Sequence, residues 1–154
     1  MVSAALFALV AASQAVAPVG GELCDTRHAP EVGVGILCER ARIALEAKEL
    51  SVARDLADVA SNMAPSHPGV WIVRAEVEQL GRQIARARAH YEKAAELEPD
   101  NPAILIAMGD FEAEEGNVRG AALLYEKAAE LDAGYPGLAE RLEAISEAPA
   151  ASEI

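Results

Sequence analysis

Apolar and small residues recur at helical spacing along most of the chain, with charged residues between them. Near the C-terminus, for example, Leu138, Leu142 and Ile145 fall at i, i+4 and i+7, which places them along one side of a helix. The same spacing along the rest of the chain predicts seven amphipathic helices. They span residues 35–48, 51–64, 68–80, 83–97, 102–115, 118–131 and 136–146.

The chain also repeats itself with a period of 34 residues. The segment from Tyr91 to Leu97 recurs unchanged from Tyr125 to Leu131. At that shift, residues 68–101 and 102–135 share 11 identities, and residues 34–67 match residues 68–101 at seven places. A fixed period of this length indicates stacked copies of one helical hairpin, because a single hairpin of this size cannot bury its own apolar faces.

The fixed residues of this unit resemble those of the tetratricopeptide repeat. The second unit carries, at that family's spacings, Trp71, Ala75, Ala87, Tyr91, Ala94 and Pro99. The third carries Leu105, Met108, Gly109, Gly116, Ala121, Tyr125 and Ala128, and the more divergent first unit carries Leu37, Ala41, Ala53, Ala60 and Pro65. Glu78 and Glu112 depart from the pattern, because the family usually has an aromatic residue at their place.

The resemblance implies an all-α solenoid of three tandem hairpins, formed by residues 34–67, 68–101 and 102–135. The helix expected over residues 136–146 would then cap the third hairpin, whose outer apolar face needs a cover. Residues 147–154, with Pro149 and several small side chains, are expected to be disordered.

Residues 1–21 contain no charged side chain. The apolar run from Ala4 to Ala12, followed by Ala15, Val16 and Ala17, is typical of a signal peptide with a cleavage site between small residues. An uncleaved membrane anchor and a first helix of the fold are the alternatives, but a membrane-spanning helix needs about 20 apolar residues. The sequence therefore predicts an exported protein, periplasmic or extracellular, with a leader at residues 22–33 and no strong membrane association after cleavage.

Export makes Cys24 and Cys38 candidates for a disulfide, because oxidising compartments preserve such bonds. Two unrelated thiols are the alternative. A metal site formed by these cysteines and His28 is disfavoured, since no paired-ligand spacing supports it. We expect neither a metal nor another cofactor.

The chain has 25 acidic and 13 basic residues and a formal charge of −12 at pH 7. A nucleic-acid partner is disfavoured, because it requires a basic face and the Lys and Arg residues here are outnumbered and scattered. The three histidines, His28, His67 and His90, are not paired with a nucleophile or a carboxylate in a known catalytic motif, and the chain has no glycine-rich phosphate loop. The sequence therefore favours a protein that is not an enzyme.

In tetratricopeptide-repeat proteins the first helix of each unit lines a concave groove that binds a polypeptide. The resemblance assigns this lining to Cys38, Arg42, Leu45, Glu46, Ile72, Glu76, Gln79, Leu80, Ile106, Asp110, Ala113 and Glu114. Ile72 and Ile106 lie one period apart, so we expect them to offer the ligand successive apolar contacts, with core packing as the alternative for each. Glu76, Asp110 and Glu114 would favour basic flanks on that ligand.

Members of the family that bind chaperone tails hold a C-terminal carboxylate with basic residues. The corresponding places here are Val73, Ala103 and Ala107, and Arg42 supplies the one nearby positive charge, so chaperone-tail binding is disfavoured. We therefore expect an adaptor that binds an apolar peptide with basic flanks. The alternatives are a self-assembling scaffold of the cell envelope, formed through the uncapped side of the first hairpin, and a regulatory subunit of an enzyme complex.

Overall fold

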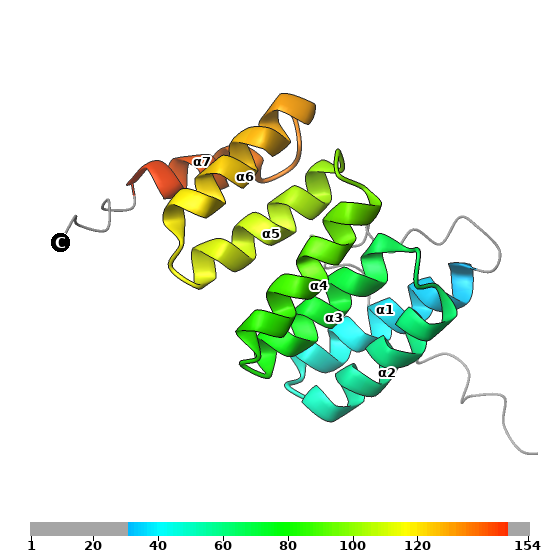
Figure 1. Ribbon diagram of the computed structural model, residues 1–154. Coiled ribbons are helices and arrows are strands. Elements are labelled where there is room, and N and C mark those ends of the chain that lie inside the picture. The colour runs from blue at the N-terminus through cyan, green and yellow to red at the C-terminus, as the bar shows by residue number, and fades with distance from the viewer. Residues whose placement is uncertain (1–30, 148–154) are drawn as a thin grey trace, which may run out of the picture.

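Residues 31–147, the part of the chain that the computed structural model describes, form seven α-helices and no strand. The helices are α1 (Glu31–Glu46), α2 (Leu50–Met63), α3 (Pro68–Leu80), α4 (Ile84–Leu97), α5 (Pro102–Glu114), α6 (Val118–Leu131) and α7 (Leu138–Glu147). Figure 1 shows three antiparallel pairs stacked side by side, with α7 beside α6 at the C-terminal end. The prediction of an all-α solenoid of three hairpins and a capping helix is confirmed.

Proline fixes the start of the first helix in the second and third hairpins. Pro68 and Pro102 are the first residues of α3 and α5, where a missing N–H leaves no bond unmade. The side chains of the preceding residues, His67 and Asn101, accept a hydrogen bond from the backbone N–H two residues later, at 3.1 and 2.9 Å. The first hairpin has Val34 at the equivalent place, and α1 begins at Glu31, four residues before its predicted start.

The turn inside each hairpin contains a residue in the left-handed backbone region. Lys48, Arg82 and Gly116 lie one period apart and have φ angles of 61°, 59° and 82°. Only glycine adopts this conformation without strain, and for other residues it costs about 1 kcal/mol or more. The turns of the first two hairpins are therefore strained at Lys48 and Arg82, whereas the turn of the third has glycine at this place.

The core consists of three clusters, each formed by one hairpin and the first helix that follows it. Val70, Val73 and Val77 of α3 join the first hairpin, and Ile104 and Phe111 of α5 join the second. In the same way, buried Leu138 of α7 packs against the third hairpin together with Leu142 and Ile145. The capping helix therefore occupies the place of a fourth first helix.

Close approach of the two helices in the third hairpin requires glycine. A Cβ atom on Gly109 would lie 2.3 Å from Cε1 of Tyr125, which no real contact allows. The Tyr125 ring fills this space between α5 and α6 and is itself 2% exposed. Gly109 therefore sets the packing distance of this hairpin.

Two buried carboxylates connect successive hairpins. Glu78 is 7% exposed and pairs with Arg54 of the preceding hairpin at 3.8 Å, and Glu112 is 5% exposed and pairs with Arg88. Asn117 also donates a hydrogen bond to Glu112, at 2.7 Å. These two departures from the repeat pattern are therefore buried links between neighbouring hairpins.

The capping helix begins at Leu138, two residues after the predicted start. Gly137 has a φ of 76°, so the helix cannot extend back through it to Pro136. The helix also continues to Glu147, one residue into the predicted tail, and residues 148–154 lie outside the described residues.

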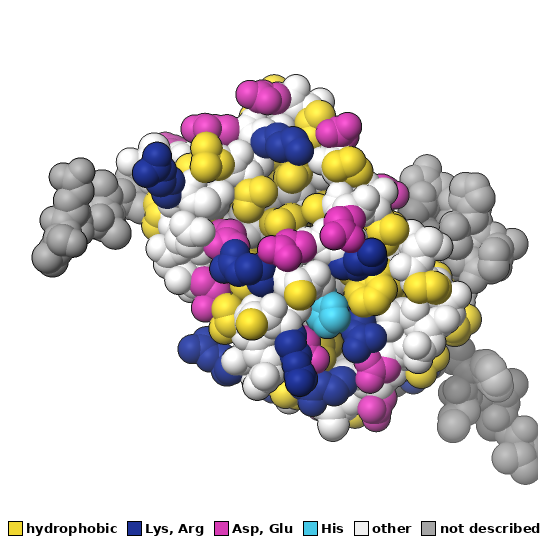
Figure 2. Space-filling view, in the orientation of Figure 1, with side chains coloured by type: hydrophobic (Ala, Val, Ile, Leu, Met, Phe, Trp, Pro, Cys, Tyr) yellow, Lys and Arg dark blue, Asp and Glu magenta, His cyan; other side chains and the backbone are white. Residues whose placement is uncertain are grey.

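On the face shown in Figure 2, acidic and basic side chains lie interspersed, with apolar side chains between them.

Candidate binding groove

A cavity of about 580 Å³ opens where α1, α3 and α5 end. Its apolar lining comes from Leu45 and Leu80, in the last turns of α1 and α3. The polar lining consists of Arg42, Glu46, Lys48, Glu76, Gln79, Arg82, Glu114 and Glu115. Because three helices end here, the negative ends of their dipoles favour a positive group on a ligand.

A second cavity of about 230 Å³ extends from the first toward α7. It shares Arg42, Glu76, Gln79 and Glu114 with the first cavity, so the two are parts of one groove. The remaining lining residues are Tyr91, Ala103, Ile106, Ala107, Asp110, Phe111, Tyr135, Pro136 and Arg141. The groove therefore runs along the first helices of all three hairpins to the start of the cap.

An ion pair between α1 and α3 lies at the centre of this groove. Nε of Arg42 lies 3.4 Å from Oε2 of Glu76, and their side chains are 11% and 31% exposed. Burial raises the pKa of Glu76, and the nearby Arg42 guanidinium opposes this change without reversing it. The Glu76 charge is therefore partly compensated inside the molecule.

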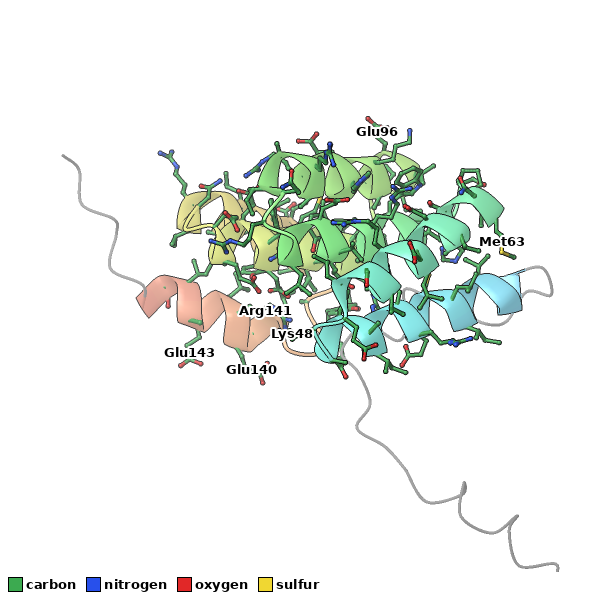
Figure 3. All side chains as sticks on the ribbon, turned by 90° about the horizontal axis from the view of Figure 1, so that it is seen from below. Lys48, Met63, Glu96, Glu140, Arg141 and Glu143 are labelled. Carbon is green, nitrogen blue, oxygen red and sulfur yellow. The ribbon has the colours of Figure 1, made fainter. Side chains whose placement is uncertain are left out.

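Asp110 of α5 accepts hydrogen bonds from the capping helix and from α6. Arg141 donates two hydrogen bonds to its carboxylate, from Nε at 2.7 Å and from Nη2 at 2.8 Å, and Tyr125 donates a third at 2.6 Å. The hydrogen bond to Asp110 raises the pKa of Arg141. Figure 3 shows Arg141 on the side of α7 that faces the other helices, while Glu140 and Glu143 point away. Asp110 lines the smaller cavity, and its carboxylate is paired within the molecule by Arg141.

Gln79 connects the second and third hairpins inside the groove. Its Nε2 donates a hydrogen bond to Oε2 of Glu114 at 2.6 Å, and its Oε1 accepts one from the hydroxyl of Tyr91 at 3.1 Å. Burial raises the pKa of Tyr91, so this hydroxyl stays protonated and remains a donor. The Glu114 side chain is exposed at the edge of the larger cavity.

Three of the predicted lining residues do not contribute to the groove. Ile72 has no exposed surface and packs in the second core, Cys38 is fully buried in the first, and Ala113 packs against the third. Ile106 is only 5% exposed, although it contacts the smaller cavity. The expected pair of isoleucine contacts therefore needs correction, because Ile72 belongs to the core and the apolar surface of the larger cavity comes from two leucines. The other predicted residues line one or both cavities.

The sequence analysis did not identify several lining residues. Lys48 and Arg82 line the larger cavity from the strained turns, and Tyr135 and Arg141 line the smaller one from the cap. A signal existed for the first pair, because a cation stands at the same place in two units where the third has Gly116. Nothing in the spacing of the cap revealed that Arg141 would reach α5.

No model of a known protein family matches this sequence, and no curated protein matches it. Solved structures do resemble it. The first TPR domain of Spaghetti (RPAP3), bound to the HSP90 peptide SRMEEVD, has a TM-score of 0.63 and 19% identity over 75% of this chain and 92% of that chain. The fold is that of a tetratricopeptide-repeat domain.

Two further structures show the same tetratricopeptide-repeat fold. The first TPR domain of human RPAP3, solved by NMR, has a TM-score of 0.65 and 19% identity over 77% of this chain and 92% of that chain. The Sgt2 TPR domain from Aspergillus fumigatus has a TM-score of 0.63 and 23% identity over 79% of this chain and 87% of that chain. About three quarters of this chain therefore corresponds to nearly complete domains of this fold.

The places expected for a chaperone-tail clamp are also visible. Val73 is fully buried in the first core, whereas Ala103 and Ala107 line the smaller cavity.

Cys24 lies outside the described residues, so its pairing with Cys38 stays a prediction. Within residues 31–147, no helix is both long and apolar enough to cross a membrane, and no group of three metal-ligating side chains lies together.

Proposed function

We propose that this chain is a non-catalytic adaptor that binds a polypeptide segment in the groove along α1, α3 and α5. The observation that carries the proposal is the groove itself, two adjoining cavities lined from all three hairpins and the cap. The fold supports it too, since a domain of this fold binds the HSP90 peptide. The uncharged segment of residues 1–21 supports export, so the partner would lie outside the cytoplasm.

The lining of the larger cavity suggests the chemistry of the ligand. Leu45 and Leu80 offer it an apolar contact, and Glu114 and Glu115 lie beside them near the dipole end of α5. The ligand would place an apolar residue on the leucines and a basic residue against these carboxylates. An acidic chaperone tail fits less well, because Val73, Ala103 and Ala107 occupy the clamp places.

A double variant of the two leucines tests this proposal. Leu45→Ser with Leu80→Ser removes the apolar contact, so it should weaken binding of the captured partner about tenfold or more. The measurement is affinity capture by the tagged full chain from its native host, followed by mass spectrometry and titration of the partner so identified.

The matched control is Leu123→Ser, which changes an exposed leucine on α6 that lines neither cavity. It should retain the partner, and the circular dichroism spectra of both variants should match that of the wild type. Equal capture by the folded double variant and the wild type would place the binding surface elsewhere.

A further inference from the structure

One end of the solenoid presents an apolar surface, which we call the end face. It consists of Ile36 and Ile43 on α1 and of Val52, Val59 and Met63 on α2. Their exposed fractions are 50%, 56%, 44%, 48% and 56%. The spacing of i and i+7 on α1 and of i, i+7 and i+11 on α2 keeps each set on one side of its helix. Figure 3 shows Met63 at the far end of α2, beside the start of α1, which agrees with its contact distance of 3.6 Å from a Cβ placed on Gly33.

The two isoleucines occupy places that pack against a preceding hairpin everywhere else in the chain. At the same places stand Val70 and Val77 in α3, Ile104 and Phe111 in α5, and Leu138 and Ile145 in α7. All six belong to or pack against the core clusters between successive hairpins. Ile36 and Ile43 therefore form the same docking stripe, but no hairpin among the described residues covers it.

The exposed valines of α2 also distinguish the first hairpin, because the equivalent places in α4 and α6 include charged residues. Val59 stands where α4 and α6 have Lys93 and Lys127, and both of these lysines are exposed. Val52 stands where α4 has exposed Arg86. The first hairpin therefore has valines where the other hairpins have exposed cations. Apolar side chains at these places indicate that the end face contacts another protein surface and not solvent.

A single cation lies in the middle of this surface. Arg40 falls between Ile36 and Ile43 on α1 and is exposed, and none of the ion pairs within residues 31–147 includes it. Its equivalent in the second hairpin, Arg74, pairs with Asp58 of the preceding hairpin at 2.8 Å. A cover for the end face should therefore bring a carboxylate to Arg40.

We propose that the end face binds the same face of a second copy of this chain, so that two first hairpins form a four-helix contact about a two-fold axis. Positions 36, 40 and 43 on α1 and 52, 56, 59 and 63 on α2 advance by alternate steps of four and three, the spacing of helix-bundle seams. An isologous contact places each surface against an identical one, so both apolar stripes are buried together.

Charge also favours a second copy at this surface. Glu39 follows one edge of the α1 stripe and exposed Asp55 lies beside the α2 stripe, so a two-fold axis brings carboxylates toward the Arg40 of the other copy. The chain as a whole carries −12, which opposes association in general, but the five end-face residues include no carboxylate that would add local repulsion. The groove residues Arg42 and Glu46 lie on another side of α1, so the dimer would present two open grooves.

Light scattering and sedimentation of the full chain test the proposal. The wild type should change from one to two chains per particle as its concentration rises. Val59→Lys, which installs the residue of the second and third hairpins, and Ile43→Glu should each raise the dissociation constant about tenfold or more. Leu123→Glu, on an exposed leucine outside the end face, should leave it unchanged.

The outcomes separate clearly. A wild type that stays monomeric at every concentration, whether its end face is bare or covered by its own residues 1–30, would overturn the proposal. So would a dimer that both folded variants leave intact, since the contact would then lie elsewhere. Because Val59 and Ile43 are half exposed, both variants should keep the wild-type helical spectrum, and neither result depends on whether the groove binds a peptide.

Discussion

Glu78 and Glu112 occupy the same place in successive hairpins but differ in their partners. Glu112 accepts hydrogen bonds from both Arg88 and Asn117, whereas Oε2 of Glu78 accepts none and lies 3.8 Å from Arg54. A buried carboxylate offsets its desolvation only when its oxygens are paired and hydrogen-bonded. The two equivalent positions therefore hold one carboxylate whose oxygens are hydrogen-bonded and one with an oxygen that lacks a hydrogen bond.

Replacement by glutamine should reveal this difference. Glu112→Gln places an amide N–H₂ against Arg88 or Asn117, so the free energy of unfolding should fall by about 1–3 kcal/mol. Glu78→Gln should change it by less, because fewer hydrogen bonds are lost. Urea unfolding of both variants gives the two values, and a larger loss for Glu78→Gln would contradict this interpretation.

Glu76 predicts a dependence of stability on pH. Because burial raises its pKa in the folded protein above the ordinary 4.5, the protonated carboxyl stabilises the fold, and this contribution is lost as the pH rises through the folded value. Glu76→Gln keeps a neutral side chain throughout. The melting temperature of the variant minus that of the wild type should therefore be more positive at about pH 7 than at about pH 4. The opposite trend would mean that the attraction of Arg42 outweighs burial.

At the scale of elements, α7 closes the apolar side of the third hairpin and anchors it by charge. Leu138 is 1% exposed in the third core, and Arg141 makes its two-pronged contact with Asp110. An uncovered last hairpin would expose its apolar side to water. The cap therefore contributes both to stability and to the end of the groove.

Removal of residues 136–154 should lower the melting temperature and broaden the unfolding transition followed by circular dichroism. Leu138→Ala isolates the packing contribution and should lower the free energy of unfolding by about 2–5 kcal/mol, the usual cost of such a cavity. Leu123→Ala, at a leucine that is 61% exposed, serves as its control and should have little effect. An unchanged transition after the truncation would remove the capping role of α7.

The helices were predictable because their signals are local. Proline at residues 68 and 102 sets two helix starts, and the 34-residue period transfers the arrangement to the other hairpins. The end of α1 and the start of α7 differ from their predicted positions because they depend on backbone conformation. Lys48 and Gly137 have φ angles of 61° and 76°, which the spacing of apolar residues does not reveal. Element type thus followed from periodicity, whereas exact boundaries did not.

At the scale of the whole molecule, the chain has two distinct surfaces: the groove along α1, α3 and α5, and the end face of the first hairpin. The sequence located the groove only in part. Ile72, Glu76 and Leu80 share one side of α3 by spacing, yet Ile72 is buried and the other two line the cavity. Which part of that side is covered depends on α5, because its Ile104 and Phe111 pack in the same cluster as Ile72.

The docking stripe that recurs every 34 residues also makes the length of this protein adjustable. Each first helix carries its own contacts for the hairpin before it, and the ion pairs of the two buried carboxylates, Arg54 with Glu78 and Arg88 with Glu112, both join residues 24 apart. A duplicated copy of residues 68–101, inserted after residue 101, would meet a matching partner on both sides. Gene duplication or deliberate design could therefore lengthen the solenoid one hairpin at a time, while the cap and the first hairpin keep their roles at the two ends.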